Sequence, residues 1–489
     1  MYIFIYSLSF FLFIFIYILF PAFFFAFCHY QYSYTLFEND RNFSHLSELE
    51  REMSLRTEMG FYYSYYKMLA QDYPLTTGVS RLMYDKLVEY PKEVNAFNRF
   101  NIHPEVICHA VSRPGYEPVD ACNGLGVPML FYLEALWTLA AGSRVFVIDC
   151  ISNSSSESLF GGLLAVCQYF ANHKDVTRVH WTPNERENFA WPLLLLQSWM
   201  ITILIIFLIS LFQIGIFFLN CLSLLFWQFS QFIFFTQTFI FFLMEQLHII
   251  DNKSLCVYLH SHFCGLHMAI LLLQGNEMLK TSLYSAFFAA VSLYCLLFSS
   301  LRIKVQNRLD FFVEAWLVVL RISIAFFASI YIKKIVGEFL GTQDDSHIWD
   351  LLFSKFITRQ SRGQQLVHLN MYVLNKKLNC PGEFDDPKLE ELLLWVRNST
   401  IPGAAFAGSM PLMAAVMLTA RRPIVVHPHY EHLDTRQTDR QTERDIFVST
   451  HTQTHTHIHT HTHTHTHTHT HREREREILV LFYKSVYIL

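Results

Sequence analysis

The sequence predicts a mainly α-helical protein that crosses a membrane several times. Hydrophobic residues make up 52% of its 489 residues and charged residues only 16%, whereas an average globular protein is about 25% charged. Mean hydropathy is +0.25, and no charged residue occurs between Glu187 and Glu245. The net charge of −4 is too small to indicate a partner, and nothing in the sequence indicates binding to nucleic acid.

The N-terminal segment 1–27 is expected to be the first transmembrane span. Its residues are almost all Phe, Ile, Leu and Tyr, and about 20 apolar residues suffice to cross the hydrocarbon of a bilayer. It lacks the basic start, the shorter apolar core and the small-residue cleavage site of a signal peptide. Pro21 is a candidate kink.

A long polar loop, 28–126, follows the first span. Within it, 44–69 has apolar residues at helical spacing and predicts an amphipathic helix. Ser47 with Glu50 fits a capping box at its start, and Gly60 is the expected end or kink. The loop also contains a glycosylation sequon at Asn42, which is usable only in the lumen.

Ten cysteines are scattered without a CxxC pair, so neither a zinc site nor a redox motif is supported. Cys28, Cys108 and Cys122 share the polar loop. Two of them could form a disulfide bond if the loop is lumenal, but buried, unpaired thiols are the favoured interpretation.

Eight further apolar stretches give nine predicted spans. A turn is expected near Trp227 and Gln228, inside the long uncharged region. The predicted stretches are 127–147, 159–170, 191–211, 214–235, 239–250, 257–274, 282–298 and 311–336.

Counting these spans places most polar loops on one side of the membrane. With a cytosolic start, the loop 28–126, the segment 171–190 and everything after residue 336 are lumenal. Basic residues at 302, 304 and 308 then fall on the cytosolic side, as the positive-inside rule expects. Lys333 and Lys334 oppose this orientation, although long basic side chains at a helix end reach the interface.

The C-terminal part divides into two kinds of sequence. Residues 337–433 mix polar and apolar segments, as expected for a lumenal segment and a truncated extramembrane domain. Residues 434–489 contain Thr-Asp-Arg-Gln, His-Thr and Arg-Glu repeats, which simple DNA repeats encode. A metal-binding histidine tract is the alternative. The predicted organisation is thus a first span (1–27), a first loop (28–126), a bundle of about eight further spans (127–336), the segment 337–433 and a repeat-derived tail (434–489).

Four clusters of polar residues are candidates for chemistry. Arginine suits a lipid-linked phosphate because its planar fork matches phosphate oxygens, and a carboxylate in a semi-enclosed cavity can accept a proton. Considered alone, however, these residues fit interfacial anchors, helix caps and a solvated helix face at least as well. The clusters are the helix around Glu58, the segment 177–189 with Arg178 and Arg186, the residues Asp344 to His347, and the residues His427 to Glu431.

Several blocks of sequence resemble the dumpy-nineteen-like family of protein C-mannosyltransferases. The similarity is collinear from about Tyr34 to Glu431, with gaps. It implies a multispan glycosyltransferase of the C type (GT-C-like), with its active site in lumenal loops. The blocks are YTLFEND, HLSELEREMSLRTEMGFYYSYYK, NRFNIHPEV, TRVHWTP with RENF, WQFSQF, GNEMLKTS, DDSHI, and FAGSMPLMA through RRPIVVHPHYE.

This resemblance implies a specific reaction. Mannose from dolichyl-phosphate mannose is expected to be transferred to C2 of tryptophan in WxxW-type segments of secretory-pathway or membrane polypeptides, at the membrane of the endoplasmic reticulum or, alternatively, of the nuclear envelope. Glu58 in RTEMG matches the family's catalytic carboxylate, and Arg186 and Arg178 are expected at the donor phosphate. No cofactor or metal is implied. The other expected substrate-binding residues are Trp181, Asp344, His347, Glu52 and Arg56.

The sequence also departs from the family pattern. The family's WTPPLRES is WTPNEREN here, with Asn184 and Glu185 in place of Pro and Leu, and spans expected between 356 and 378 are absent. A non-catalytic membrane scaffold or anchor, or an inactive truncated product, is therefore an alternative. Transport is a third, since Glu134 and Arg144 lie in an apolar stretch, but paired broken helices and repeats are missing.

Overall fold

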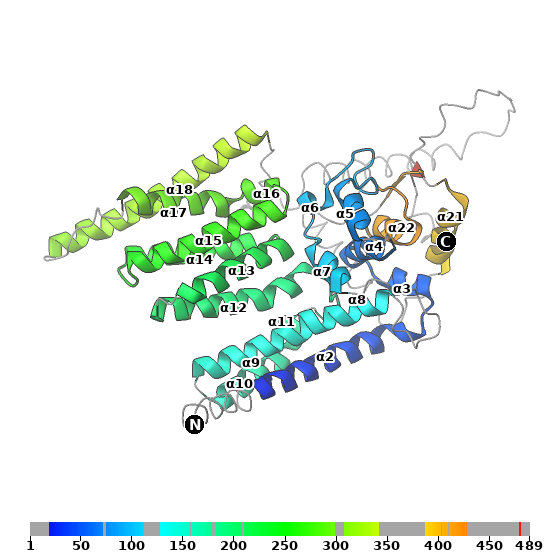
Figure 1. The fold of residues 1–489 in the computed structure, drawn as a ribbon, viewed down its shortest axis with the longest axis horizontal. Coiled ribbons are helices and arrows are strands. Elements are labelled where there is room, and N and C mark those ends of the chain that lie inside the picture. Colours follow the sequence, from blue (N-terminus) through cyan, green and yellow to red (C-terminus); the bar gives the residue numbers. More distant parts are fainter. Residues whose placement is uncertain are drawn as a thin grey trace, which may run out of the picture. The chain divides into compact units, whose positions relative to one another are not determined.

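The structure is a computed structural model, in which helices dominate (Figure 1). It describes residues 19–71, 75–111, 128–298 except 157, 178, 180, 208 and 209, then 308–341, 387–427 except 402, 409 and 426, and 479–480. Arg178, Asp344, His347 and nearly all of the repeat tail lie outside the described residues. The same is true of Cys122 and of most of the first predicted span.

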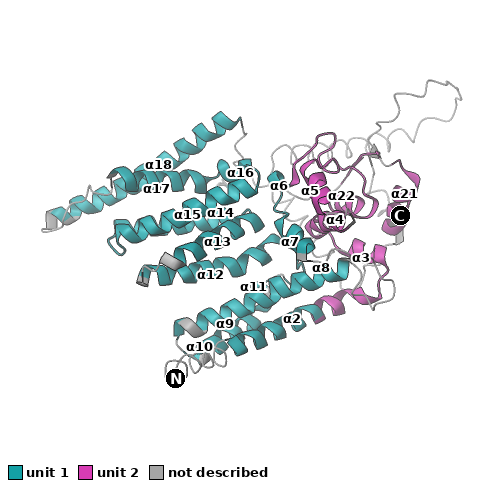
Figure 2. Cartoon of the chain, viewed as in Figure 1, with its two compact units in different colours: residues 1–34, 97–342 teal, residues 35–96, 343–489 magenta. Residues whose placement is uncertain are grey.

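The chain forms two compact units (Figure 2). Unit 1 comprises Met1–Tyr34 and Phe97–Thr342, and unit 2 comprises Thr35–Ala96 and Gln343–Leu489. Helix α2 (Phe20–Arg41) begins in unit 1 and ends in unit 2. Each unit is described by itself.

Unit 1 is a bundle of apolar helices joined by short connections. A π-helical segment, η3 (Trp137–Gly142), separates α8 from α9. The helices are α6 (Ala96–Arg99), α7 (His103–Val111), α8 (Pro128–Leu136), α9 (Ser143–Ser156), α10 (Leu159–Ala171), α11 (His173–Val176), α12 (Arg186–Phe207), α13 (Ser210–Phe226), α14 (Ser230–Gln246), α15 (Asn252–Leu272), α16 (Glu277–Lys280), α17 (Leu283–Phe298) and α18 (Arg308–Leu340).

Five helices in the described part of the chain are long and apolar enough to cross a membrane, fewer than the nine predicted spans. They are Met129–Ser152, Arg186–Ile205, Asn252–Leu272, Glu277–Leu297 and Phe312–Leu340. Each of the eight predicted stretches nevertheless overlaps a helix. Two neighbouring boundaries were wrong: the stretch 214–235 is divided between α13 and α14, and the stretch 239–250 begins inside α14. The chain turns at 227–229, at the predicted Trp227 and Gln228.

The bundle buries polar as well as apolar side chains. Helix α12 packs on α13, and α13 packs on α15. Nε2 of Gln197 on α12 donates to Oδ1 of Asn220 on α13 at 2.9 Å. The same nitrogen lies 3.5 Å from Nε2 of His262 on α15. Polar groups inside a membrane bundle bond to one another because lipid offers them no partner. This network therefore holds three helices in register.

Unit 2 is built around α4 (Glu58–Gln71), which packs on α22 (Met410–Ala420). The aromatic run of α4 forms the core, since Phe61, Tyr62, Tyr65 and Tyr66 are all buried. The other elements are η2 (Phe43–His45), α3 (Glu48–Ser54), α5 (Leu75–Met83), α21 (Pro387–Ser399) and the parallel strand pair β1 (Phe406–Ala407) and β2 (Leu479–Val480).

Candidate functional site

Glu58 is the first residue of α4 and is half-buried. The predicted helix 44–69 is divided into η2, α3 and α4, and the break lies at 55–57 rather than at Gly60. Thr57 takes the left-handed conformation (φ 52°) that separates α3 from α4. A Cβ on Gly60 would lie 2.5 Å from the carbonyl oxygen of Leu55, so glycine permits the close approach at this bend.

The start of α3 confirms the predicted capping box. The backbone N–H of Glu50 donates to Oγ of Ser47, and the Ser47 N–H donates back to Oε2 of Glu50 at 2.6 Å. Both orphan donors at this helix end are satisfied in this way. Glu50 thus has a structural role, which distinguishes it from Glu58.

Glu52 forms a buried ion pair with Lys67. Burial raises the pKa of the Glu52 carboxyl, and the ammonium of Lys67 opposes that shift. Lys67 also donates to the carbonyl of Leu418 at 3.4 Å. These contacts join α3, α4 and α22. Of the other residues expected near the substrate, Arg56 is half-buried in the break and Trp181 is 44% exposed.

The segment around His427 is attached to α4 within unit 2. The buried His427 ring stacks on Phe61 with centroids 5.6 Å apart, and its Nε2 lies 3.0 Å from Oε1 of Glu89. Phe61 is three residues after Glu58, so one helix carries both. His427, the described residue of the fourth predicted polar cluster, therefore packs on the helix that carries Glu58.

A further buried carboxyl, that of Asp85, is hydrogen-bonded to α4. The Tyr65 hydroxyl donates to Oδ2 of Asp85 at 2.9 Å, and the Leu87 N–H donates to Oδ1 at 2.8 Å. Burial raises the pKa of Asp85 to about 6, against the effect of these two bonds. Sequence reasoning missed Asp85, because nothing in the local pattern distinguishes it from an exposed aspartate.

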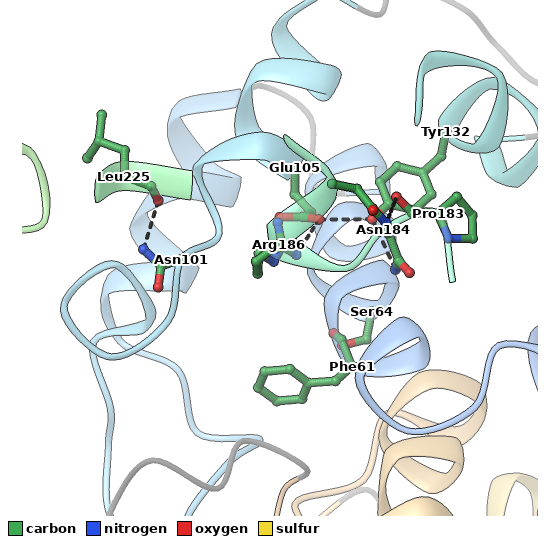
Figure 3. Close-up of polar contacts among 10 residues, drawn as sticks. Phe61, Ser64, Asn101, Glu105, Tyr132, Pro183, Asn184, Arg186 and Leu225 are labelled. Carbon is green, nitrogen blue, oxygen red and sulfur yellow. Dashed lines mark hydrogen bonds and ion pairs between the residues drawn. The ribbon is translucent and has the colours of Figure 1, made fainter. Parts of the chain in front are cut away.

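Arg186 begins α12 in unit 1 and is held by a buried carboxylate (Figure 3). Its Nη2 lies 2.6 Å from Oε1 of Glu105, which also accepts from the Tyr132 hydroxyl at 2.8 Å. Nδ2 of Asn184 donates to that hydroxyl at 3.4 Å. Asn184, one of the two departures from the family pattern, is therefore part of the network that positions Arg186.

Burial and the ion pair with Arg186 shift the pKa of the Glu105 carboxyl in opposite directions. Burial raises the pKa of this carboxyl, while Arg186 lowers it, first by its charge and then by its hydrogen bond. Oε2 of Glu105 is buried without a hydrogen-bond partner among the described residues. Sequence analysis missed Glu105 as a partner for Arg186, although it lies in the block NRFNIHPEV.

The residues that the sequence singled out fall in different parts of the chain. Glu58, Glu52 and Arg56 belong to unit 2, whereas Trp181 and Arg186 belong to unit 1. Within the described ranges, no group of three or more His, Cys, Asp or Glu side chains is arranged to hold a metal ion.

Long apolar helices with buried polar networks define a multispan helical membrane protein. Its family follows from comparison with known proteins: the family model described as "Dpy19: Q-cell neuroblast polarisation" matches residues 23–373 and 364–459. The chain belongs to the Dpy19 family. The resemblance found in the sequence is thereby confirmed, and the matched region extends beyond 34–431 at both ends.

Curated relatives match most of the chain. The "C-mannosyltransferase dpy-19" of Caenorhabditis elegans is 30% identical over 555 residues, covering 83% of this chain and 80% of that protein. "Protein C-mannosyl-transferase DPY19L1" is 29% identical in Homo sapiens, covering 83% and 81%, and 29% in Rattus norvegicus, covering 83% and 74%. Because the worm alignment is longer than this chain, the relative carries internal segments that are missing here.

Proposed function

We propose that this chain is a C-mannosyltransferase that transfers mannose from dolichyl-phosphate mannose to C2 of tryptophan in WxxW-type segments of secretory-pathway polypeptides. The observation that carries the proposal is the alignment with relatives named C-mannosyltransferases over 83% of the chain. The proposed location is the membrane of the endoplasmic reticulum, with the Glu58 loop in the lumen.

The proposed reaction forms a carbon–carbon bond. C2 of the indole attacks the anomeric carbon of mannose while the bond from that carbon to the phosphate oxygen breaks. The phosphate leaves with the electron pair as dolichyl phosphate. The indole then loses its C2 proton to a base and regains aromaticity. A carboxylate and a cation for the leaving phosphate therefore suffice for this chemistry.

Glu58 is the proposed base. It lies in the first turn of α4, where the helix dipole stabilises negative charge. Its side chain is half-buried and so partly accessible to a substrate, whereas the carboxylate of Glu52 is buried. The rigid aromatic core beneath α4 fixes the position of the carboxylate, which general-base catalysis requires.

Arg186 is the proposed contact of the leaving phosphate. Glu105 and Tyr132 fix its orientation, and the planar fork of a guanidinium matches phosphate oxygens. Glu105 and Tyr132 act through Arg186 and are positioning residues. Arg178, Asp344 and His347 remain proposed members of the substrate site, with Trp181, Glu52 and Arg56.

Mass spectrometry of a WxxW reporter co-expressed with the chain tests this function. We expect a mannose adduct with the wild-type chain and none with Glu58→Gln at equal protein level. Glu50→Gln is the matched control, because glutamine also fits the capping box, and it should retain the adduct. An adduct that persists in Glu58→Gln would exclude this residue as the base.

A non-catalytic scaffold is the second candidate. It is favoured by the internal segments that the relatives have and this chain lacks. A scaffold predicts no adduct with any reporter, together with stable co-purification of another membrane protein. An adduct from the purified chain would exclude it.

A further inference from the structure

Arg144 is a buried guanidinium in unit 1 without a carboxylate ion-pair partner among the described residues. It is 2% exposed, and its Nη2 donates to Oδ1 of Asn188 at 3.2 Å. Its Nε is buried and has no hydrogen-bond partner in the described structure. Burying a charge without a partner is costly, and a bound anion would offset that cost.

The contrast with Arg186 is direct. The charge of Arg186 is balanced by Glu105 at 2.6 Å. Arg144 is attracted by the half-buried Glu187, but the two form no ion pair. Of these two arginines, Arg144 is therefore the one that has no carboxylate at ion-pair distance in the described part of the chain.

The polar groups in direct contact with Arg144 are neutral. The hydroxyl of Tyr169 interacts with its guanidinium and lies 3.4 Å from Nε2 of His29. That nitrogen lies 2.8 Å from Nε2 of His173, while Nδ1 of His29 lies 2.7 Å from the carbonyl of Ala141. Burial, and then the charge of Arg144, lower the pKa of His173 to about 4. These groups thus surround the cation without neutralising it.

The partners of Arg144 come from the ends of helices. Asn188 lies in the first turn of α12, Trp191 follows one turn later, and Tyr169 is in the last turn of α10. Ends of spanning helices lie at the level of lipid headgroups. Arg144 is accordingly placed at the depth of a lipid phosphate, although it lies within the long helix Met129–Ser152.

One half-exposed side chain packs over the guanidinium. The ring centroid of Trp191 lies 5.7 Å from Cζ of Arg144, and Trp191 is 40% exposed. Trp191 is therefore a partly exposed side chain between the guanidinium and the surface of α12. An arginine fork binds such oxygens through parallel N–H bonds.

We propose that Arg144 is a binding site for the phosphate of a polyprenyl-phosphate lipid, with Asn188 and Tyr169 orienting its guanidinium and Trp191 covering it. Naming this lipid as the mannosyl donor or its dolichyl-phosphate product rests on the proposed function. The anion site itself rests on a buried guanidinium that no carboxylate pairs among the described residues, and on its contact with the first turn of α12.

The test is ligand-induced thermal stabilisation of the purified full chain in detergent. The probes are a short-chain polyprenyl phosphate, the same polyprenol without phosphate, and inorganic phosphate. We expect stabilisation by the polyprenyl phosphate alone, and a clearly smaller stabilisation in Arg144→Gln, where Arg186 is left as the proposed contact of the phosphate. Equal stabilisation of Arg144→Gln and wild type would overturn the proposal. Stabilisation by inorganic phosphate at equal concentration would overturn the lipid assignment, and so would equal stabilisation by the polyprenol.

A matched pair of variants keeps the test valid if Arg144→Gln fails to fold. Trp191→Gln and Trp191→Glu both remove the ring, but only the second places a carboxylate beside Arg144. We expect Trp191→Glu to bind the polyprenyl phosphate about tenfold more weakly than Trp191→Gln, the effect of one charge-assisted contact. Equal affinities would overturn the proposal. Mannosyl transfer is measured on the same samples, so that lipid binding without transfer contradicts the proposed function and leaves the Arg144 site standing.

Discussion

Nε2 of His427 lies 3.0 Å from Oε1 of Glu89, and the same imidazole stacks on Phe61. The pair joins residues 338 positions apart within unit 2. Since Phe61 is one turn after Glu58, the C-terminal segment braces the helix that carries the proposed base. A disturbance at His427 is therefore expected to reach the active site through α4.

Replacing His427 should destabilise unit 2. His427→Ala removes a buried hydrogen bond and the ring contact with Phe61, at a cost of about 1–3 kcal/mol. His427→Gln keeps a donor for Glu89 and should recover part of the loss. The apparent melting temperature and the mannose adduct are measured for both variants. Equal melting temperatures in wild type and His427→Ala would contradict the bracing role.

Gly60 is expected to tolerate no side chain. In Gly60→Ala the new Cβ meets the Leu55 carbonyl oxygen at 2.5 Å, so the bend between α3 and α4 must shift. Overpacking of this kind costs about 1–3 kcal/mol, and the shift should reduce transfer by displacing Glu58. Gly403→Ala, where nothing lies within 4 Å of the new Cβ, is the control. It should change neither the apparent melting temperature nor mannosyl transfer. Unchanged transfer in Gly60→Ala would show that the bend does not position the base.

The sequence predicted the local parts of the fold. Each apolar stretch overlapped a helix, the capping box of Ser47 and Glu50 formed, and the turn at Trp227 was found. These features depend on residues close together in the chain. The break at 55–57 was placed wrongly because Gly60 is a weak local signal, whereas the actual break depends on the left-handed Thr57 and the close approach of Leu55.

The candidate site was predicted only in part. Arg186 and Glu58 emerged from motifs, but the partner of Arg186 lies 81 residues away at Glu105. His427 and Glu89 are further apart still. Such pairs depend on tertiary packing, which hydropathy and spacing do not encode. Arg144 was visible as a charge in an apolar stretch, but only the three-dimensional structure shows that no described carboxylate pairs with it.

Asp85 should make stability depend on pH. Its pKa is raised to about 6 in the folded chain, above its usual value near 3.9 when unfolded. The native state therefore binds this proton more tightly than the unfolded state. Its contribution to the free energy of unfolding is full below about pH 4 and is lost as pH rises through 6. By pH 7 the buried carboxylate costs about 3 kcal/mol relative to its protonated form.

Asp85→Asn removes this titration, and asparagine still accepts from the Leu87 N–H. The difference in apparent melting temperature between variant and wild type, measured from pH 4 to pH 7, should rise in favour of the variant as pH increases. Asp175→Asn, at an exposed position, is the control and should give a flat difference. A flat difference for Asp85→Asn would show that Asp85 does not titrate in this range.

The ion pair between Glu105 and Arg186 should show strong coupling. Glu105→Gln leaves the buried guanidinium without its carboxylate, and breaking a buried pair from one side costs about 3–5 kcal/mol. The double variant Glu105→Gln/Arg186→Gln removes both charges and should lose less stability than the sum of the two single variants. Transfer activity should stay low in the double variant, because the proposed phosphate contact is gone. A double-mutant cycle on apparent stability measures this coupling.

The exposed pair of Lys86 and Glu93, 2.7 Å apart, is the matched control for that cycle. Its side chains are 71% and 53% exposed, so solvent screens their attraction and the coupling should stay below about 1 kcal/mol. Additive losses at Glu105 and Arg186 would mean that the two side chains do not act as a pair. If the double variant regained transfer, Arg186 would not be the phosphate contact.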